Sequence, residues 1–124
     1  MKSKLDESRP IYLQIKEYIE DSILNDTLKS GDRVPSTNEF AKFYNINPAT
    51  ARQGVNELVD ELIIRKQRGV GMFVTENAKS ILIESRQAGF KKDFIMPLIK
   101  EAEKLDISLN KLIELIKESD INED

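Results

Sequence analysis

The chain has 124 residues, of which 40 % are hydrophobic and 33 % are charged, and its formal net charge is −3. This length suits one compact domain, or one small domain with an appendage. The chain contains no cysteine and no histidine, which removes disulfides, the usual zinc ligands and the commonest general base of enzymes. No apolar run approaches the roughly 20 residues of a membrane span, and the first residues lack the apolar core of a secretion signal. We therefore expect a cytoplasmic protein that is not an enzyme and has no metal site, no cofactor and no membrane partner.

The first predicted helix begins at Pro10, a residue type well placed in a first helical turn, and should end near Asn25. Every fourth residue along it is an isoleucine, which marks one face that must be buried. These residues are Ile11, Ile15, Ile19 and Ile23. Residues 28–35 contain a turn signal at Gly31 and end at Pro35, so we expect them to form a connector.

Two helices with a short turn between them should follow. Ser36 and Glu39 have the spacing of a capping box, which predicts a short helix. Asn47 is a favourable N-cap and Pro48 a favourable first helical residue, so a second helix should run from there to about Glu61. The start of that helix would present free N–H groups and the positive end of the helix dipole to a phosphate.

The second of these helices is amphipathic. Its predicted core side comprises Ala51, Val55, Leu58, Val59 and Leu62, and its polar side comprises Ala49, Arg52, Gln53 and Asn56. Gly54 lies between the two faces. Because glycine inside a helix costs roughly 1 kcal/mol relative to alanine, we expect a neighbouring helix to approach closely there.

A β-hairpin is predicted directly after these helices. Residues 62–64 and 72–74 are β-prone runs, and the turn between them contains Arg68 and Gly69. A hairpin in this place is a wing. Between residues 42 and 68 the chain carries five basic and three acidic side chains, a small local excess in an acidic protein.

The polar side of the second helix carries the residue types that contact DNA. Arginine can grip guanine or phosphate with two hydrogen bonds, glutamine and asparagine can pair with adenine, and threonine can bond phosphate. An ordinary solvated helix face has the same composition, and the positive turn of the hairpin would also suit a guarded strand edge. The pattern of each segment alone therefore leaves both interpretations open.

Residues 77–124 return to helical periodicity. A helix is expected from Asn77, a break or bend at Gly89, a second helix that holds Pro97 near its start, and a last helix capped by Ser108. About 45 helical residues are few for a core of their own. We expect their apolar faces to pack against a second copy of the chain related by a two-fold axis.

Four linked motifs resemble the winged helix-turn-helix of the GntR family of bacterial transcription regulators. They are Pro10-Ile-Tyr-Leu-Gln-Ile, Leu28-Lys-Ser-Gly-Asp-Arg-Val-Pro-Ser, Asn47-Pro-Ala-Thr-Ala-Arg and Arg68-Gly-Val-Gly-Met-Phe-Val. The short helical tail is similar to that of the YtrA subfamily. The resemblance implies a DNA-binding domain over residues 1–76, a helical dimerisation domain over residues 77–124, and a symmetric operator.

The resemblance also implies where DNA is contacted. Family contacts carry over to matching residues at Ser36, Thr50, Arg52, Arg68 and Gly69. The chain departs from the family at Asn38, where arginine is common, and at Pro48, where some subfamilies have arginine or lysine. The first departure removes a charged contact and so affects which operator is bound.

We therefore predict a mainly α-helical fold with a small β-hairpin wing and a short C-terminal helical domain. The predicted function is that of a homodimeric bacterial repressor that binds a two-fold symmetric operator in double-stranded DNA, with room for a small-molecule effector of unknown identity. The alternative is a winged-helix protein-interaction module without direct DNA readout. The predicted DNA-binding residues are Ser36, Asn38, Ala49, Thr50, Arg52, Gln53, Arg68 and Gly69.

Overall fold

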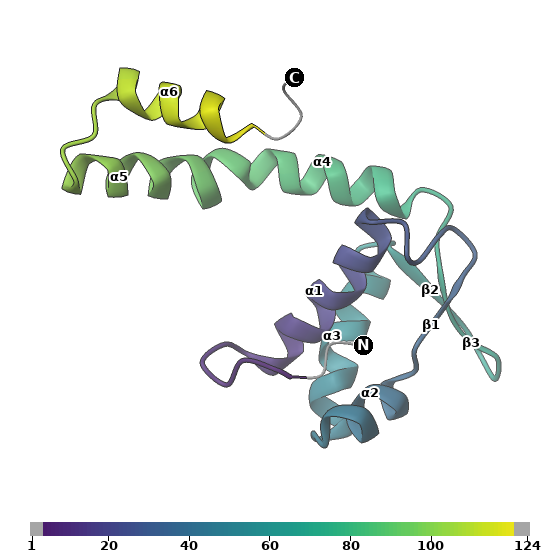
Figure 1. The fold of residues 1–124 in the computed structure, drawn as a ribbon. Coiled ribbons are helices and arrows are strands. Elements are labelled where there is room, and N and C mark those ends of the chain that lie inside the picture. The colour runs from purple at the N-terminus through teal and green to yellow at the C-terminus, as the bar shows by residue number, and fades with distance from the viewer. Residues whose placement is uncertain (1–3, 121–124) are drawn as a thin grey trace. The chain divides into compact units, whose positions relative to one another are not determined.

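The computed structural model describes residues 4–120 of the chain. It comprises two compact units, Met1–Glu84 and Ser85–Asp124. The elements of the first unit are α1 (Ile11–Leu24), β1 (Arg33–Val34), α2 (Thr37–Tyr44), α3 (Pro48–Asp60), β2 (Ile64–Gln67) and β3 (Gly71–Val74) (Figure 1). The predicted class, mainly helical with a small β-hairpin wing, is confirmed.

The sheet has one strand more than the hairpin predicts. Its three strands are antiparallel in the order β1-β3-β2. The segment predicted as a connector contains β1, whose Val34 pairs with Met72 on β3. Two residues are too few to show the alternation by which a strand is recognised in a sequence. The wing hairpin itself begins at Ile64, two residues later than the predicted β-prone run.

The isoleucine stripe of α1 lies at the centre of the first unit. Ile15 and Ile19 are fully buried, and Ile23 is nearly so. They share a core with Phe40 of α2 and with buried residues of α3 and the sheet, including Ala51, Val55, Leu58, Ile64 and Val74. The predicted core side of α3 is thus confirmed for Ala51, Val55 and Leu58, but Leu62 is 68 % exposed. Leu62 lies after the helix end with φ +65°, so the helical periodicity no longer applies to it.

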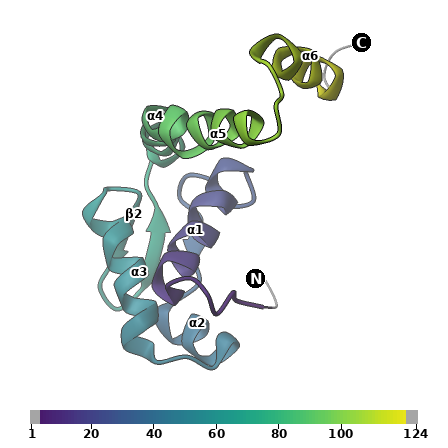
Figure 2. The same ribbon diagram turned by 90° about the vertical axis from the view of Figure 1, so that its left-hand side faces the viewer.

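Helices α1 and α3 pack side by side (Figure 2). Gly54 is buried at their contact, where a Cβ atom would overlap the carbonyl oxygen of Tyr12. The predicted close approach of a neighbouring helix at Gly54 is therefore confirmed. The approach is possible because glycine has no side chain, and it sets the distance between α1 and α3.

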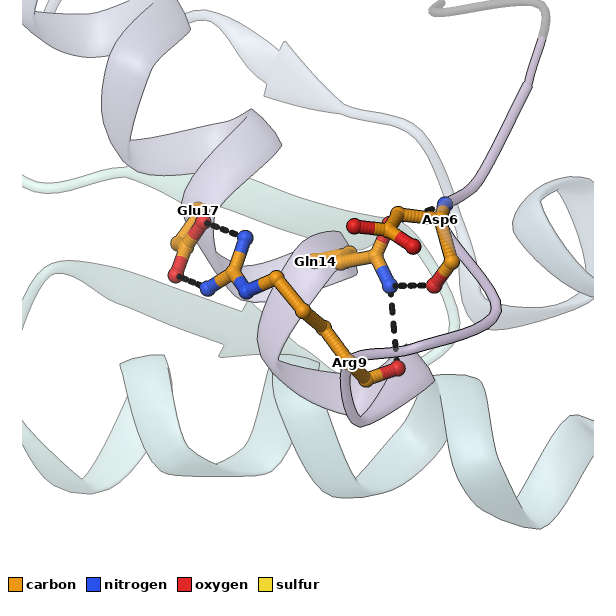
Figure 3. Close-up of polar contacts among 4 residues, drawn as sticks. All are labelled: Asp6, Arg9, Gln14 and Glu17. Atoms are coloured by element: carbon orange, nitrogen blue, oxygen red, sulfur yellow. Dashed lines mark hydrogen bonds and ion pairs between the residues drawn. The ribbon is translucent and has the colours of Figure 1, made fainter.

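The segment before α1 is tied back onto that helix (Figure 3). The Gln14 side chain accepts a hydrogen bond from the Asp6 N–H at 2.7 Å and donates to the Arg9 carbonyl at 3.1 Å. The Arg9 guanidinium forms a two-point ion pair with the Glu17 carboxylate. These contacts hold the segment before α1 against the first two turns of the helix, whose N-cap residue Pro10 makes no side-chain hydrogen bond.

The helix after the wing begins in the first unit. α4 (Ala78–Phe90) starts directly after Asn77, and its residues Ala78 and Leu82 are buried in the core of the first unit. The division between the two compact units falls inside α4, after Glu84, whereas the predicted boundary lies at residue 76. The boundary between functional domains stays a prediction.

The second unit contains the end of α4 and two more helices. A π-helical segment, η1 (Lys91–Ile95), joins α4 to α5 (Met96–Lys104), and α6 (Leu109–Ser119) follows. A break at Gly89, one of the two outcomes expected there, is wrong, because helical structure continues through it and the irregular turn comes just after. A bend at Gly89 stays a prediction. Pro97 lies in the first turn of α5, as predicted. Ser108 caps α6, accepting the Lys111 N–H at 3.2 Å. Over residues 4–120, no helix has the length and apolar character required to cross a bilayer.

Candidate nucleic-acid interface

The turn between α2 and α3 fixes the two helices at an angle. Asn45 ends α2 in the left-handed region with φ +52°, a conformation that asparagine tolerates better than most residues. The Ile46 N–H bonds back to the Ala41 carbonyl at 3.0 Å. Two residues later Asn47 begins α3. The arrangement is a helix-turn-helix, with α3 in the place of the second helix.

The first turn of α3 differs from the prediction in one respect. Its N–H groups already have acceptors: the Ala49 N–H donates to the Asn47 side chain at 2.9 Å, and the Thr50 N–H donates to the Asn47 carbonyl at 3.0 Å. Pro48 has no N–H. The expectation of free donors for a phosphate at this helix start is therefore wrong, because Asn47 caps the turn so completely. The positive end of the helix dipole remains.

The polar side of α3 is exposed as predicted. Arg52, Gln53 and Ala49 are exposed, and Thr50 is half-buried. At the opposite end of the helix, Lys16 of α1 bonds the carboxylates of Glu57 and Glu61, the first at 3.2 Å.

The ion pairs of Lys16 with Glu57 and Glu61 offset negative charge at the C-terminal end of α3. Partial burial acts to lower the pKa of Lys16, but the hydrogen bonds to Glu61 and Glu57 outweigh it and raise the pKa above its ordinary value. Lys16 therefore stays charged and compensates negative charge at the end of α3 that lies away from Arg52.

The wing turn is built around glycine. Gly69 has φ +77°, a left-handed conformation that suits glycine, and the Val70 N–H closes the turn on the Gln67 carbonyl at 2.9 Å. Arg68 is exposed in this turn, and Val70 is 55 % exposed. The turn thus presents backbone, one positive charge and one apolar side chain to a partner.

A cavity with a volume of about 530 Å³ lies between the wing, the start of α2 and α3, and we call its lining the concave surface. Its lining residues are Arg33, Val34, Ser36, Thr37, Asn38, Arg52, Lys66, Gln67, Gly69, Val70, Gly71 and Met72. Three of these are basic and none is acidic, although the whole chain carries a net charge of −3. This distribution favours an anionic partner, because local charge governs contact more than net charge does.

The predicted DNA-binding residues divide into two groups. Ser36, Asn38, Arg52 and Gly69 line the concave surface together, although they come from three separate elements. The others lie outside it, Ala49, Thr50 and Gln53 along α3 and Arg68 in the wing turn. Contact of these eight residues with DNA stays a prediction.

Two basic residues of the concave surface were not among the predicted contacts. Arg33 lies on β1 and Lys66 on β2, and both are exposed. The signal for Lys66 was its place in the positively charged hairpin. Arg33 carried no such signal, because its position depends on the pairing of β1 with β3, which joins segments about 40 residues apart (Arg33 pairs with Phe73).

These features define a class of protein. Three helices with a helix-turn-helix corner, followed by a wing on a small antiparallel sheet, form a winged helix-turn-helix domain, the architecture of many DNA-binding proteins. The exposed polar side of the second helix and the basic surface beside the wing agree with that class.

Comparison with known proteins identifies the family. The model for bacterial regulatory proteins of the gntR family matches residues 11–74. The chain is 38 % identical over 111 residues to the HTH-type transcriptional repressor YtrA of Bacillus subtilis (strain 168), covering 90 % of this chain and 85 % of that protein. The chain belongs to the gntR family and is a DNA-binding transcription regulator.

Solved structures agree with this assignment. A GntR family transcriptional regulator from Listeria monocytogenes is 34 % identical with a TM-score of 0.74, and the match covers 94 % of this chain and 100 % of that one. The DNA-binding domain of AraR, solved in complex with operator ORE1, is 25 % identical with a TM-score of 0.52, covering 60 % of this chain and 94 % of that one.

Proposed function

We propose that the protein is a transcriptional repressor that binds a two-fold symmetric operator as a homodimer in the cytoplasm. The observation that carries this proposal is the basic concave surface between α3 and the wing, which contains three cations and no acidic side chain. The similarity to a transcriptional repressor over most of both chains supports repression rather than activation.

The shape of the first unit supports the following docking on DNA. α3 enters the major groove, where Arg52 makes the main base or phosphate contact and Thr50 and Gln53 assist. The Arg68–Gly69 turn enters the flanking minor groove, where arginine and a close backbone approach are favourable. In a two-fold dimer the half-sites lie about one helical turn, roughly 10 base pairs, apart.

The second unit supplies the surface for pairing. Within its described residues only Ala102 and Leu112 are buried. A groove of about 1050 Å³ lies between α5 and α6 and is lined largely by apolar side chains, including Leu98, Leu105, Ile107, Leu115 and Ile116. Apolar surface of this extent on so small a unit marks an interface, and a second copy of the same unit covers it in an isologous contact.

An effector would act through the spacing of the two DNA-binding units. The helices of the second unit set that spacing in the dimer, so a small molecule that binds one arrangement better than another shifts the population of DNA-competent dimers. The apolar groove between α5 and α6 is a place for such a molecule at the edge of the dimer contact.

Mobility shifts with DNA fragments upstream of the protein's own gene and its neighbours test the proposal, together with the mass of the protein in solution. We expect two copies per site, and an affinity that falls steeply as salt rises, because phosphate contacts release counterions. A monomer in solution and on DNA would refute the paired-site mechanism. Failure to bind DNA, or binding that does not respond to salt, would favour the protein-interaction module instead.

A further inference from the structure

Arg33 lies in a row of three residues across the sheet. It pairs with Phe73 on the central strand, and Phe73 pairs with Arg65 on the other side. Directly paired residues of antiparallel strands place their side chains on the same face, so the two arginines flank one aromatic ring. The Arg65 guanidinium carbon lies 5.1 Å from the centre of that ring, a distance at which the cation and the ring attract each other.

The Arg33 side chain lies beside Gly71, at the end of β3 that adjoins the wing turn. Gly71 is two residues before Phe73 and therefore on the same face of β3. A Cβ atom at Gly71 would lie 3.1 Å from the Arg33 Nε atom and 3.8 Å from its Cζ atom. The absence of a side chain at Gly71 thus leaves the space that the Arg33 guanidinium occupies. In this place Arg33 lines the concave surface and Arg65 does not.

The Arg33 guanidinium has hydrogen-bonding capacity to spare. Over residues 4–120 its one ion pair is with Glu39 at 3.9 Å, and both side chains are more than half exposed, so that pair contributes little. The Glu39 carboxylate is also engaged in the capping box, accepting the Ser36 N–H at 3.2 Å. A guanidinium carries five N–H donors, which leaves Arg33 able to bind an anion at the concave surface.

The position of this surface indicates which anion it meets. If α3 occupies a major groove and the wing turn the adjacent minor groove, the surface between them faces the sugar-phosphate strand that separates the two grooves. Arg33 and Lys66 line this surface from β1 and β2, and neither lies on α3, the helix proposed to read bases. Side chains in such a place position a protein on DNA and carry no sequence information directly.

We propose that Arg33 is a DNA phosphate contact, held at the concave surface by the space above Gly71. This inference rests on the proposed docking of α3 and the wing. Arg33 therefore strengthens binding to any duplex by about the same factor, whereas Arg52 also contributes to the choice of sequence.

The test measures the affinity of the full chain for a mixed-sequence duplex as a function of salt. The variant Arg33→Gln removes the charge and keeps a polar side chain, and Arg65→Gln is the matched control on the other side of Phe73. Each phosphate contact contributes about 0.9 to the slope of log affinity against log salt. We expect Arg33→Gln to lower the slope by about that amount, Arg65→Gln to leave it unchanged, and Arg33→Lys to restore most of it.

Thermal unfolding of the same variants separates contact from structure. The proposal requires Arg33→Gln to unfold at nearly the wild-type temperature while the salt slope falls. An unchanged slope for Arg33→Gln, or an equal fall for both glutamine variants, overturns the role of Arg33 while leaving wild-type DNA binding intact. Absence of salt-dependent binding by the wild-type chain would instead overturn the proposed docking as well.

Discussion

Gly54 of α3 lies against the carbonyl oxygen of Tyr12 in α1, with no room for a Cβ atom between them. This contact sets how deeply the second helix of the helix-turn-helix packs onto α1. Because α3 is held by its buried side at this depth, its polar side stays at the surface.

Gly54→Ala should destabilise the protein, although alanine is the better helix former by roughly 1 kcal/mol. The new methyl group meets backbone, which cannot rotate away as a side chain can, so α1 and α3 must separate. We expect a net loss of about 1–3 kcal/mol in the free energy of unfolding, as for an overpacked core, measured by urea denaturation. Asn56→Ala, an exposed change in the same helix, is the control and should be neutral or slightly stabilising. An equal response of both variants would contradict the close contact.

Lys16→Met should reduce stability in a pH-dependent way. The pKa of Lys16 is raised in the folded state, since its bonds to Glu61 and Glu57 outweigh the effect of burial. A raised folded pKa means that the contribution is fully present below the unfolded pKa of about 10.4 and is lost as pH rises through the folded value. We expect the difference in unfolding free energy between wild type and Lys16→Met to be constant near neutral pH and to shrink above about pH 10. A difference that does not change with pH would show that packing alone is responsible.

Substitutions of Ser36 should separate helix capping from DNA contact. The Ser36 Oγ accepts the Glu39 N–H at 3.1 Å, so Ser36→Ala should cost about 1 kcal/mol of stability. Ser36→Asp keeps a good N-cap but places a negative charge beside the basic concave surface. We expect Ser36→Asp to unfold like the wild type and to bind DNA more weakly. Wild-type affinity for Ser36→Asp in mobility shifts would place DNA away from the start of α2.

Arg52→Ala should weaken operator binding by about 1–3 kcal/mol if this side chain reads a base. Arg52 is exposed on α3 and lines the concave surface, and no ion pair within residues 4–120 engages it. The loss should be larger on the operator than on mixed-sequence DNA, which titration of both duplexes would reveal. Arg65→Ala serves as the control of equal charge. Unchanged operator affinity for Arg52→Ala would remove this residue from the interface.

Ile116→Lys should separate the proposed dimer into monomers. Ile116 is 51 % exposed in the middle of α6 and lines the apolar groove, so the change need not disturb the folded protomer. A lysine there places an unpaired charge in the contact between copies, which is strongly unfavourable. Light scattering should show a halved mass, and affinity for a two-half-site operator should fall. Glu118→Lys, an exposed change outside the groove, should remain a dimer.

Much of the fold follows from local patterns in the chain. The isoleucine spacing of α1, the capping box at Ser36 and the Asn47-Pro48 start of α3 each depend on contacts within a few residues, and the structure confirms all three. The wing was recognisable for the same reason, since its turn and both of its strands are contiguous.

Features that depend on distant segments were harder to predict. β1 is two residues long and exists because β3 offers it an unpaired edge. The break expected at Gly89 is also absent, because a glycine weakens a helix without necessarily ending it. The free N–H groups expected at the start of α3 were taken by Asn47, a matter of side-chain geometry that residue types alone leave open.

The amino-acid sequence by itself determined the helices, their caps, the wing and the family, because capping and hydrophobic periodicity act over short distances along the chain. Only the tertiary structure brought Arg33, Lys66 and Arg52 to one surface free of acidic side chains. Strand pairing and the packing of α3 on α1 decide which charges become neighbours. A net charge of −3 therefore says little about the charge that a partner meets.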